Sequence, residues 1–132
     1  MTEKATSPAI MRSMLGRARG LGSARSGLHH WWAQRLTAFA LVPLVLWFIY
    51  SAIRLSGMKR GDVINWAVDP VVGTLLVALV LALFHHMRLG LQVVIEDYIH
   101  DERPRMVWLL VMKGVTGLLG LAALVAVIKL AI

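Results

Sequence analysis

The sequence predicts an all-α integral membrane protein with three transmembrane helices and a basic N-terminal tail. Of its 132 residues, 58% are hydrophobic and 16% are charged, whereas soluble domains average about 45–50% apolar and about 25% charged residues. The apolar residues also form three long runs, each long enough to cross a bilayer. A single soluble core of this chain length could not bury so much apolar surface, which excludes an ordinary soluble enzyme and a disordered chain.

The first predicted segment is a flexible basic tail, residues 1–28, which is rich in Gly, Ser and Arg. It contains five Lys or Arg residues against one acid, Glu3, and it lacks the apolar stretch of a secretory signal peptide. A mitochondrial transit peptide is an alternative interpretation of this segment. The net charge is +7, and its largest basic group precedes the first span. The expected partner is therefore an anionic membrane surface and not nucleic acid.

The second predicted segment is a three-helix transmembrane domain, residues 29–132, with spans at about 33–54, 70–98 and 106–130. Pro43 is expected to bend the first span because proline removes a helix hydrogen bond. Residues 54–69 are expected to form a loop in which Gly57 and Gly61 interrupt the helix.

The charge of the tail predicts the orientation in the inner (cytoplasmic) membrane. Because positive segments stay in the cytoplasm, the N-terminus should be cytoplasmic. Three spans then place the loop at 99–105 on the cytoplasmic side and the C-terminus in the periplasm. Pro104 is expected to prevent an unbroken helix through this loop. Arg54, Lys59 and Arg60 argue against this orientation, since the loop that carries them would face outward.

Ionisable residues inside the second span, in the segment FHHMRLGLQVVIEDYIH, indicate a functional site. His86 precedes Tyr98 by twelve residues, or about 18 Å along a helix. It lies near the bilayer middle if Tyr98 lies at the interface. Eleven helical steps of about 100° return Asp97 to within about 20° of His86, and Gly90 shares that face. An imidazole at this depth beside a glycine is the pattern of an axial haem ligand.

The adjacent histidine, His85, is the alternative ligand. Neighbouring helix residues point about 100° apart, so at most one of the two can serve an iron on this side. His86 is preferred because it shares a face with Gly90 and Asp97. The competing interpretation is a histidine that only forms a hydrogen bond between helices.

Two more polar groups lie at the predicted cytoplasmic ends of spans. His29 and Arg35 can meet at the start of the first span, where Arg35 could hold a haem propionate or orient a quinone carbonyl. Tyr98 could donate its hydroxyl to a quinone oxygen, and Asp97 could relay the protons that reduction consumes. The alternatives are a snorkelling arginine with headgroup-binding histidines, and an aromatic-belt tyrosine on a polar helix end.

These residues give the chain a resemblance to the small membrane-anchor subunits of succinate dehydrogenase, respiratory complex II, of the alphaproteobacterial and mitochondrial type. The resemblance covers residues 26–132. SGLHHWWAQRLTA at 26–38 is similar to the family's Gly-x-His…Arg segment, and HMRLGLQVVIEDY at 86–98 to its His followed eleven and twelve residues later by Asp-Tyr. The family implies a flavoprotein that oxidises succinate, an iron–sulfur protein, and two membrane subunits that bind haem b and ubiquinone.

The resemblance also implies roles for single residues. His86 matches the haem axial ligand, with the second ligand supplied by a cytochrome b-type anchor subunit. Tyr98 matches the tyrosine that hydrogen-bonds the ubiquinone carbonyl, and Asp97 is its acidic neighbour. His29 and Arg35 match the His and Arg near the haem propionates and the quinone pocket. The implied function is membrane anchor of succinate:ubiquinone oxidoreductase, with no succinate-oxidising site in this chain.

The sequence departs from the family in several places: the adjacent His85 and His86 leave the choice of ligand open, and the basic leader at 1–25 has no counterpart. Gln92 lies five residues before Asp97, where relatives have it four before, and His30 stands where some relatives have an acid. The pattern therefore gives no role to either residue.

Two other classes of function are compatible with three apolar spans. In a small proton-relaying transporter or channel subunit, His86 and Asp97 would carry protons, but such helices usually place acids at mid-depth. Here the acids lie at the span ends. In a purely structural membrane tether, the histidines would only hydrogen-bond between helices.

Overall fold

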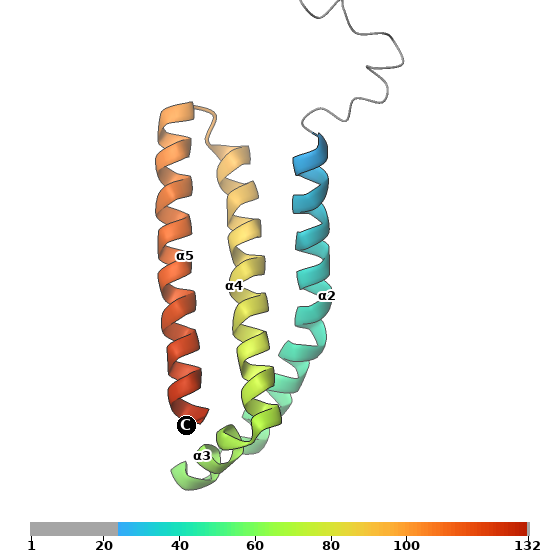
Figure 1. Ribbon diagram of the computed structural model, residues 1–132, viewed down its shortest axis with the longest axis vertical. Coiled ribbons are helices and arrows are strands. Elements are labelled where there is room, and N and C mark those ends of the chain that lie inside the picture. Colours follow the sequence, from blue (N-terminus) through green and yellow to red (C-terminus); the bar gives the residue numbers. More distant parts are fainter. Residues whose placement is uncertain (1–23, 132) are drawn as a thin grey trace, which may run out of the picture.

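The computed structural model describes residues 24–131, and this part of the chain consists of four helices and no β-strand. They are α2 (Ala24–Leu55), α3 (Arg60–Val68), α4 (Pro70–Tyr98) and α5 (Glu102–Ala131). The three long helices stand side by side with α4 in the middle, and the short α3 lies across one end (Figure 1). The predicted all-α fold is confirmed.

All three long helices are long enough and apolar enough to span a membrane. The spanning segments are Gly27–Leu55, Pro70–Tyr98 and Glu102–Leu130, each 29 residues long. A helix of this length measures about 44 Å, which exceeds a hydrocarbon core of ~30 Å, so the helices tilt or project. Only 11% of each most apolar stretch is buried within the chain. Most apolar side chains therefore face lipid or another subunit.

The first span starts earlier than the sequence indicated. Helix α2 begins at Ala24, so residues 24–28, expected as the end of the tail, are helical; the rest of the expected tail, 1–23, lies outside the described residues. Ala24, Arg25 and Leu28 are strong helix formers, and the helix continues through Gly27, a weak one. The helix also continues through Pro43, and its lower part leans toward the base of α4 (Figure 1).

The third span also starts earlier, at Glu102, so Pro104 lies inside α5 and does not break it. The first four N–H groups of a helix have no intrahelical partner, and a proline in the first turn therefore loses no hydrogen bond.

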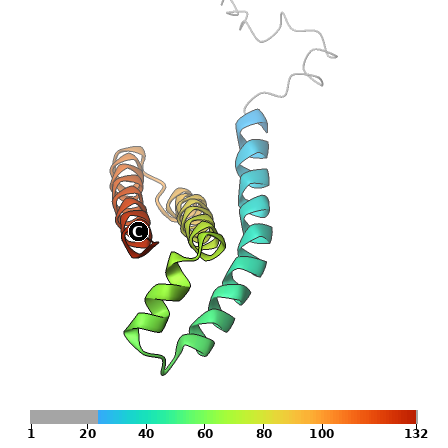
Figure 2. The same cartoon turned by 60° about the horizontal axis from the view of Figure 1, so that its bottom comes forward.

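The expected loop at 54–69 contains helix α3, which is a correction. Gly57 ends the preceding helix with φ +85°, a left-handed conformation that glycine adopts without strain. Gly61 was expected to break the helix but lies within α3. Trp66 of α3 stacks on Trp47 of α2, with ring centroids 6.0 Å apart. This contact and its packing on α4 and α5 hold α3 across the base of the bundle (Figure 2).

Helix α4 begins at a well-defined cap. The Asp69 carboxylate accepts hydrogen bonds from the backbone N–H groups of Val71 at 2.8 Å and Val72 at 3.1 Å. Pro70 occupies the first helical turn, where its missing N–H removes no intrahelical hydrogen bond. The start of α2 and the α4–α5 connection lie at one end of the bundle, and the C-terminal end of α5 lies at the other (Figure 1).

Candidate functional site

A hydrogen-bonding contact ties the middle of α4 to α2. His86 Nδ1 lies 3.0 Å from Thr37 Oγ1, across 49 positions of the sequence. The same hydroxyl lies 2.8 Å from the carbonyl oxygen of Ala33 and 3.1 Å from that of Gln34. Both side chains are half-buried. The face of α4 that carries His86 is therefore the face that packs on α2.

A hollow opens between α2 and α4, toward the start of α2. On α2 its lining includes His30, Gln34 and Arg35, and on α4 it includes Gly90 and Val93. A Cβ atom at Gly90 would lie 3.5 Å from Gln34 Nε2. The glycine predicted to leave a gap beside His86 therefore faces α2, and the Gln34 side chain lies against it.

Two polar atoms from α2, both on side chains that line this hollow, are buried without a hydrogen-bond partner among residues 24–131: His30 Nε2 and Gln34 Oε1. Buried polar atoms in proteins almost always have a partner. Arg35 lines the same hollow, and its guanidinium lies 5.2 Å from the ring centroid of Trp31. The hollow thus combines a ring nitrogen, an amide oxygen that accepts hydrogen bonds and a positive charge, which suits a polar group from outside this chain.

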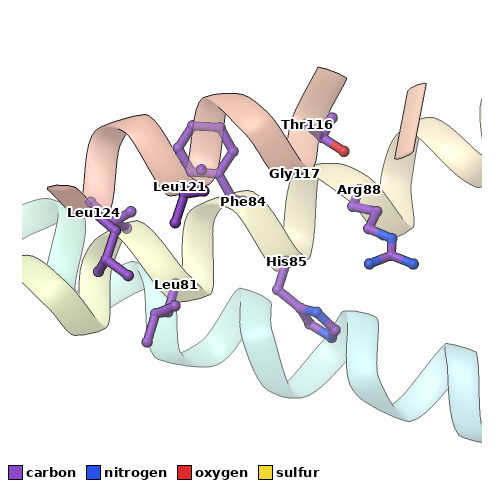
Figure 3. Close-up of a pocket in the computed structure, with 10 residues that line it drawn as sticks. Leu81, Phe84, His85, Arg88, Thr116, Gly117, Leu121 and Leu124 are labelled. Carbon is purple, nitrogen blue, oxygen red and sulfur yellow. The ribbon is translucent and has the colours of Figure 1, made fainter. Parts of the chain in front are cut away.

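Two other histidines, His29 and His85, lie outside this hollow. His29 is exposed and does not line the hollow, although its neighbour His30 does. His85 is exposed and lines a different hollow, between α4 and α5, together with Arg88 and Thr116. Figure 3 shows Phe84 pointing toward α5 in that second hollow, while His85 points away from α5.

Three residues of the α2–α4 contact were not among those that the sequence predicted: His30, Gln34 and Thr37. They follow one another at intervals of four and three, which places them on one face of a helix. That spacing could have revealed them. The early start of α2 is what makes the first of them helical.

The expected quinone-site residues of α4 lie at its end, apart from the hollow. Tyr98 is 81% exposed and Asp97 is also exposed. The helix stops there, where the Ile99 N–H donates to the Ile95 carbonyl oxygen at 3.0 Å. Among residues 24–131, Tyr98 and Asp97 share no hydrogen bond and no hollow with Arg35. Both side chains are accessible to a partner.

Gln92, to which the sequence gave no role, donates its amide to Glu96 Oε1 at 2.8 Å, one turn along α4. This contact lies within one helix and stabilises its polar end.

The chain offers few ligands for a metal ion. No group of three His, Cys, Asp or Glu side chains that could hold one occurs in the described range, 24–131. The sequence contains no cysteine at all. On the α2–α4 side the described chain presents two imidazoles, His86 on α4 and His30 on α2.

Comparison with known proteins identifies the family. Residues 9–128 match the model of the succinate dehydrogenase/fumarate reductase transmembrane subunit. The chain is 39% identical over 120 residues to the succinate dehydrogenase hydrophobic membrane anchor subunit of Rickettsia bellii, an alignment that covers 88% of this chain and 93% of that protein.

More distant relatives agree. The succinate dehydrogenase membrane anchor subunit of Reclinomonas americana is 29% identical over 63% of this chain and 72% of that protein. The hydrophobic membrane anchor subunit of Paracoccus denitrificans is 30% identical over 61% of this chain and 63% of its own length. No solved structure matches the chain. The chain therefore belongs to the family of succinate dehydrogenase and fumarate reductase transmembrane subunits, as a membrane anchor of the alphaproteobacterial and mitochondrial type.

Proposed function

We propose that this membrane anchor binds haem b through His86, jointly with a second, cytochrome b-type anchor subunit, and contributes to the ubiquinone-reduction site of succinate:ubiquinone oxidoreductase. The observation that carries the proposal is the His86 ring in the middle of α4, held through Nδ1 by Thr37. Histidine ligands of metals are typically held in this way, with one ring nitrogen bonded to the protein and the other bonded to the metal. Haem supplies one-electron transfer when it is bound.

The hollow between α2 and α4 would accommodate the propionate carboxylates of haem b. Arg35 would pair with a propionate, and the unsatisfied His30 Nε2 would donate to it. Rotation of the Gln34 amide would present its NH₂ group in the same place. His29, exposed one residue from His30, would meet the propionate region from the interface with the second anchor subunit.

The quinone site is proposed for the same end of the bundle. Ubiquinone is soluble in lipid and enters from the side, so its head group reaches the membrane edge. There the Tyr98 hydroxyl would donate to a quinone carbonyl, Arg35 would orient the head group, and Asp97 would relay protons. The high exposure of Tyr98 supports a pocket that a partner subunit completes.

The remaining steps belong to partners. Without cysteine, this chain holds no iron–sulfur cluster. Succinate oxidation is assigned to a flavoprotein subunit, and electron delivery to an iron–sulfur subunit on the cytoplasmic side. The end with the start of α2 and the polar segment 99–105 would face these subunits, and the C-terminus would face the periplasm.

Visible spectra of the purified complex, reduced with dithionite, test the proposal. His86→Ala should abolish the low-spin bis-histidine haem signal. His85→Ala is the matched control, because this adjacent histidine lines the other hollow, between α4 and α5, and it should keep the signal. A complex that retains the full haem signal after His86→Ala would contradict the proposal.

A further inference from the structure

We infer that Thr37 is a positioning residue that keeps the proton of the His86 ring on Nδ1 and leaves Nε2 as the nitrogen with the free lone pair. The inference rests on the proposed haem ligation by His86. Nothing in the sequence pattern had singled out Thr37.

The argument begins with the single proton of the threonine hydroxyl. Thr37 Oγ1 has three neighbours: the carbonyl oxygen of Ala33 at 2.8 Å, that of Gln34 at 3.1 Å, and His86 Nδ1 at 3.0 Å. The carbonyl oxygens can only accept. The shortest contact takes the proton, so the hydroxyl donates to Ala33. Its oxygen then offers lone pairs to His86, and the third contact is a hydrogen bond only if Nδ1 carries the ring proton.

This arrangement fixes the chemistry of the ring. A neutral imidazole has one N–H, and with that proton on Nδ1 the other nitrogen, Nε2, is the one able to bind iron. A ring that donates from its distal N–H is also a more basic ligand. A more basic ligand stabilises ferric over ferrous iron, so the contact should lower the midpoint potential of the haem.

Thr37 itself is held firmly enough for this role. Its branched side chain has few rotamers in a helix, and the bond to Ala33 selects one of them. It also lies on the same helical face as His30 and Gln34, so one stripe of α2 would contact both the ligand and the propionate carboxylates.

The test is redox potentiometry of the haem absorption in the purified complex, comparing two substitutions at one position. Thr37→Val keeps the branched shape and removes the hydroxyl, and it should move the midpoint potential to a more positive value. Thr37→Ser keeps the hydroxyl and should restore the wild-type potential. Thr74→Val is the matched control, because the Thr74 hydroxyl is exposed on α4 and bonds only its own helix, at Pro70, 2.8 Å away.

Loss of haem from Thr37→Val with retention in Thr37→Ser would also support the inference, since it shows that the hydroxyl is required. An unchanged potential in Thr37→Val, or an equal shift in Thr37→Ser, would overturn it. Failure of haem ligation itself is distinguishable, because His86→Ala would then keep its haem signal.

Discussion

Gly120 of α5 lies directly against the ring of Phe84 of α4. A methyl group at Gly120 would lie 3.2 Å from Phe84 Cγ and 3.4 Å from its Cβ, closer than ordinary van der Waals contact. Gly114 and Gly117 precede Gly120 at helical spacing on α5, yet a Cβ at either would meet nothing within 4 Å. Within this chain, close approach of α4 and α5 therefore depends on Gly120 alone among these three glycines.

Gly120→Ala should destabilise the helix pair relative to Gly117→Ala. Both changes gain the same helix propensity, so the comparison isolates the clash with Phe84. Overpacking of this kind costs about 1–3 kcal/mol. The check is the thermal denaturation midpoint of the detergent-solubilised complex, which should be lower for Gly120→Ala. Equal midpoints would show that the Phe84 ring moves aside freely.

Asp69→Ala should weaken the start of α4, because the carboxylate accepts from two otherwise unbonded N–H groups. Loss of such a cap costs about 1 kcal/mol. Asp69→Asn should be nearly neutral, since asparagine caps helices as well as aspartate does. The measurement is again the denaturation midpoint of the complex. If both substitutions lower it equally, the charge of Asp69 matters and not its hydrogen bonds.

The sequence predicted what composition and helical periodicity control. Three apolar runs gave three spans, and a separation of four residues placed Gly90 and His86 on one face, which proved to be the face toward α2. The sequence did not show what that face meets. His30 and Thr37 belong to α2. Pairing them with residues of α4 requires knowing how the two helices align along one another, which the sequence pattern of either helix does not contain.

The errors at helix ends have a common physical origin. Glycine and proline favour breaks in a sequence pattern wherever they occur, but Gly61 and Pro104 both lie inside helices. A proline in a first turn loses no hydrogen bond, and a glycine in a helix costs only about 1 kcal/mol. Packing of α3 through Trp66 on Trp47 is the kind of tertiary contact that outweighs such a cost.

Tyr98→Phe should leave the complex assembled and slow quinone reduction about tenfold, the effect of losing one hydrogen bond to the substrate. Succinate oxidation with an artificial acceptor should stay nearly unchanged, because that electron path ends before the quinone site. Tyr50→Phe, on α2 near its far end, is the matched control and should behave like the wild type. Equal losses with both acceptors in Tyr98→Phe would indicate a structural role.

Arg35→Ala should reduce quinone turnover by about ten- to a hundredfold, the range expected for loss of a hydrogen bond from a charged donor. The amount of assembled complex should fall much less, since Arg35 contributes to a hollow and not to a packed core. Arg54→Ala is a close control. Arg54 lies over the Tyr50 ring, 6.0 Å from its centroid, just as Arg35 lies over the Trp31 ring. Arg54 is at the opposite end of α2. Quinone turnover and the content of complex, measured on the same membranes, separate the two effects. If Arg54→Ala lowers turnover as much as Arg35→Ala, the loss reflects general damage to α2 and the quinone-site role of Arg35 is wrong.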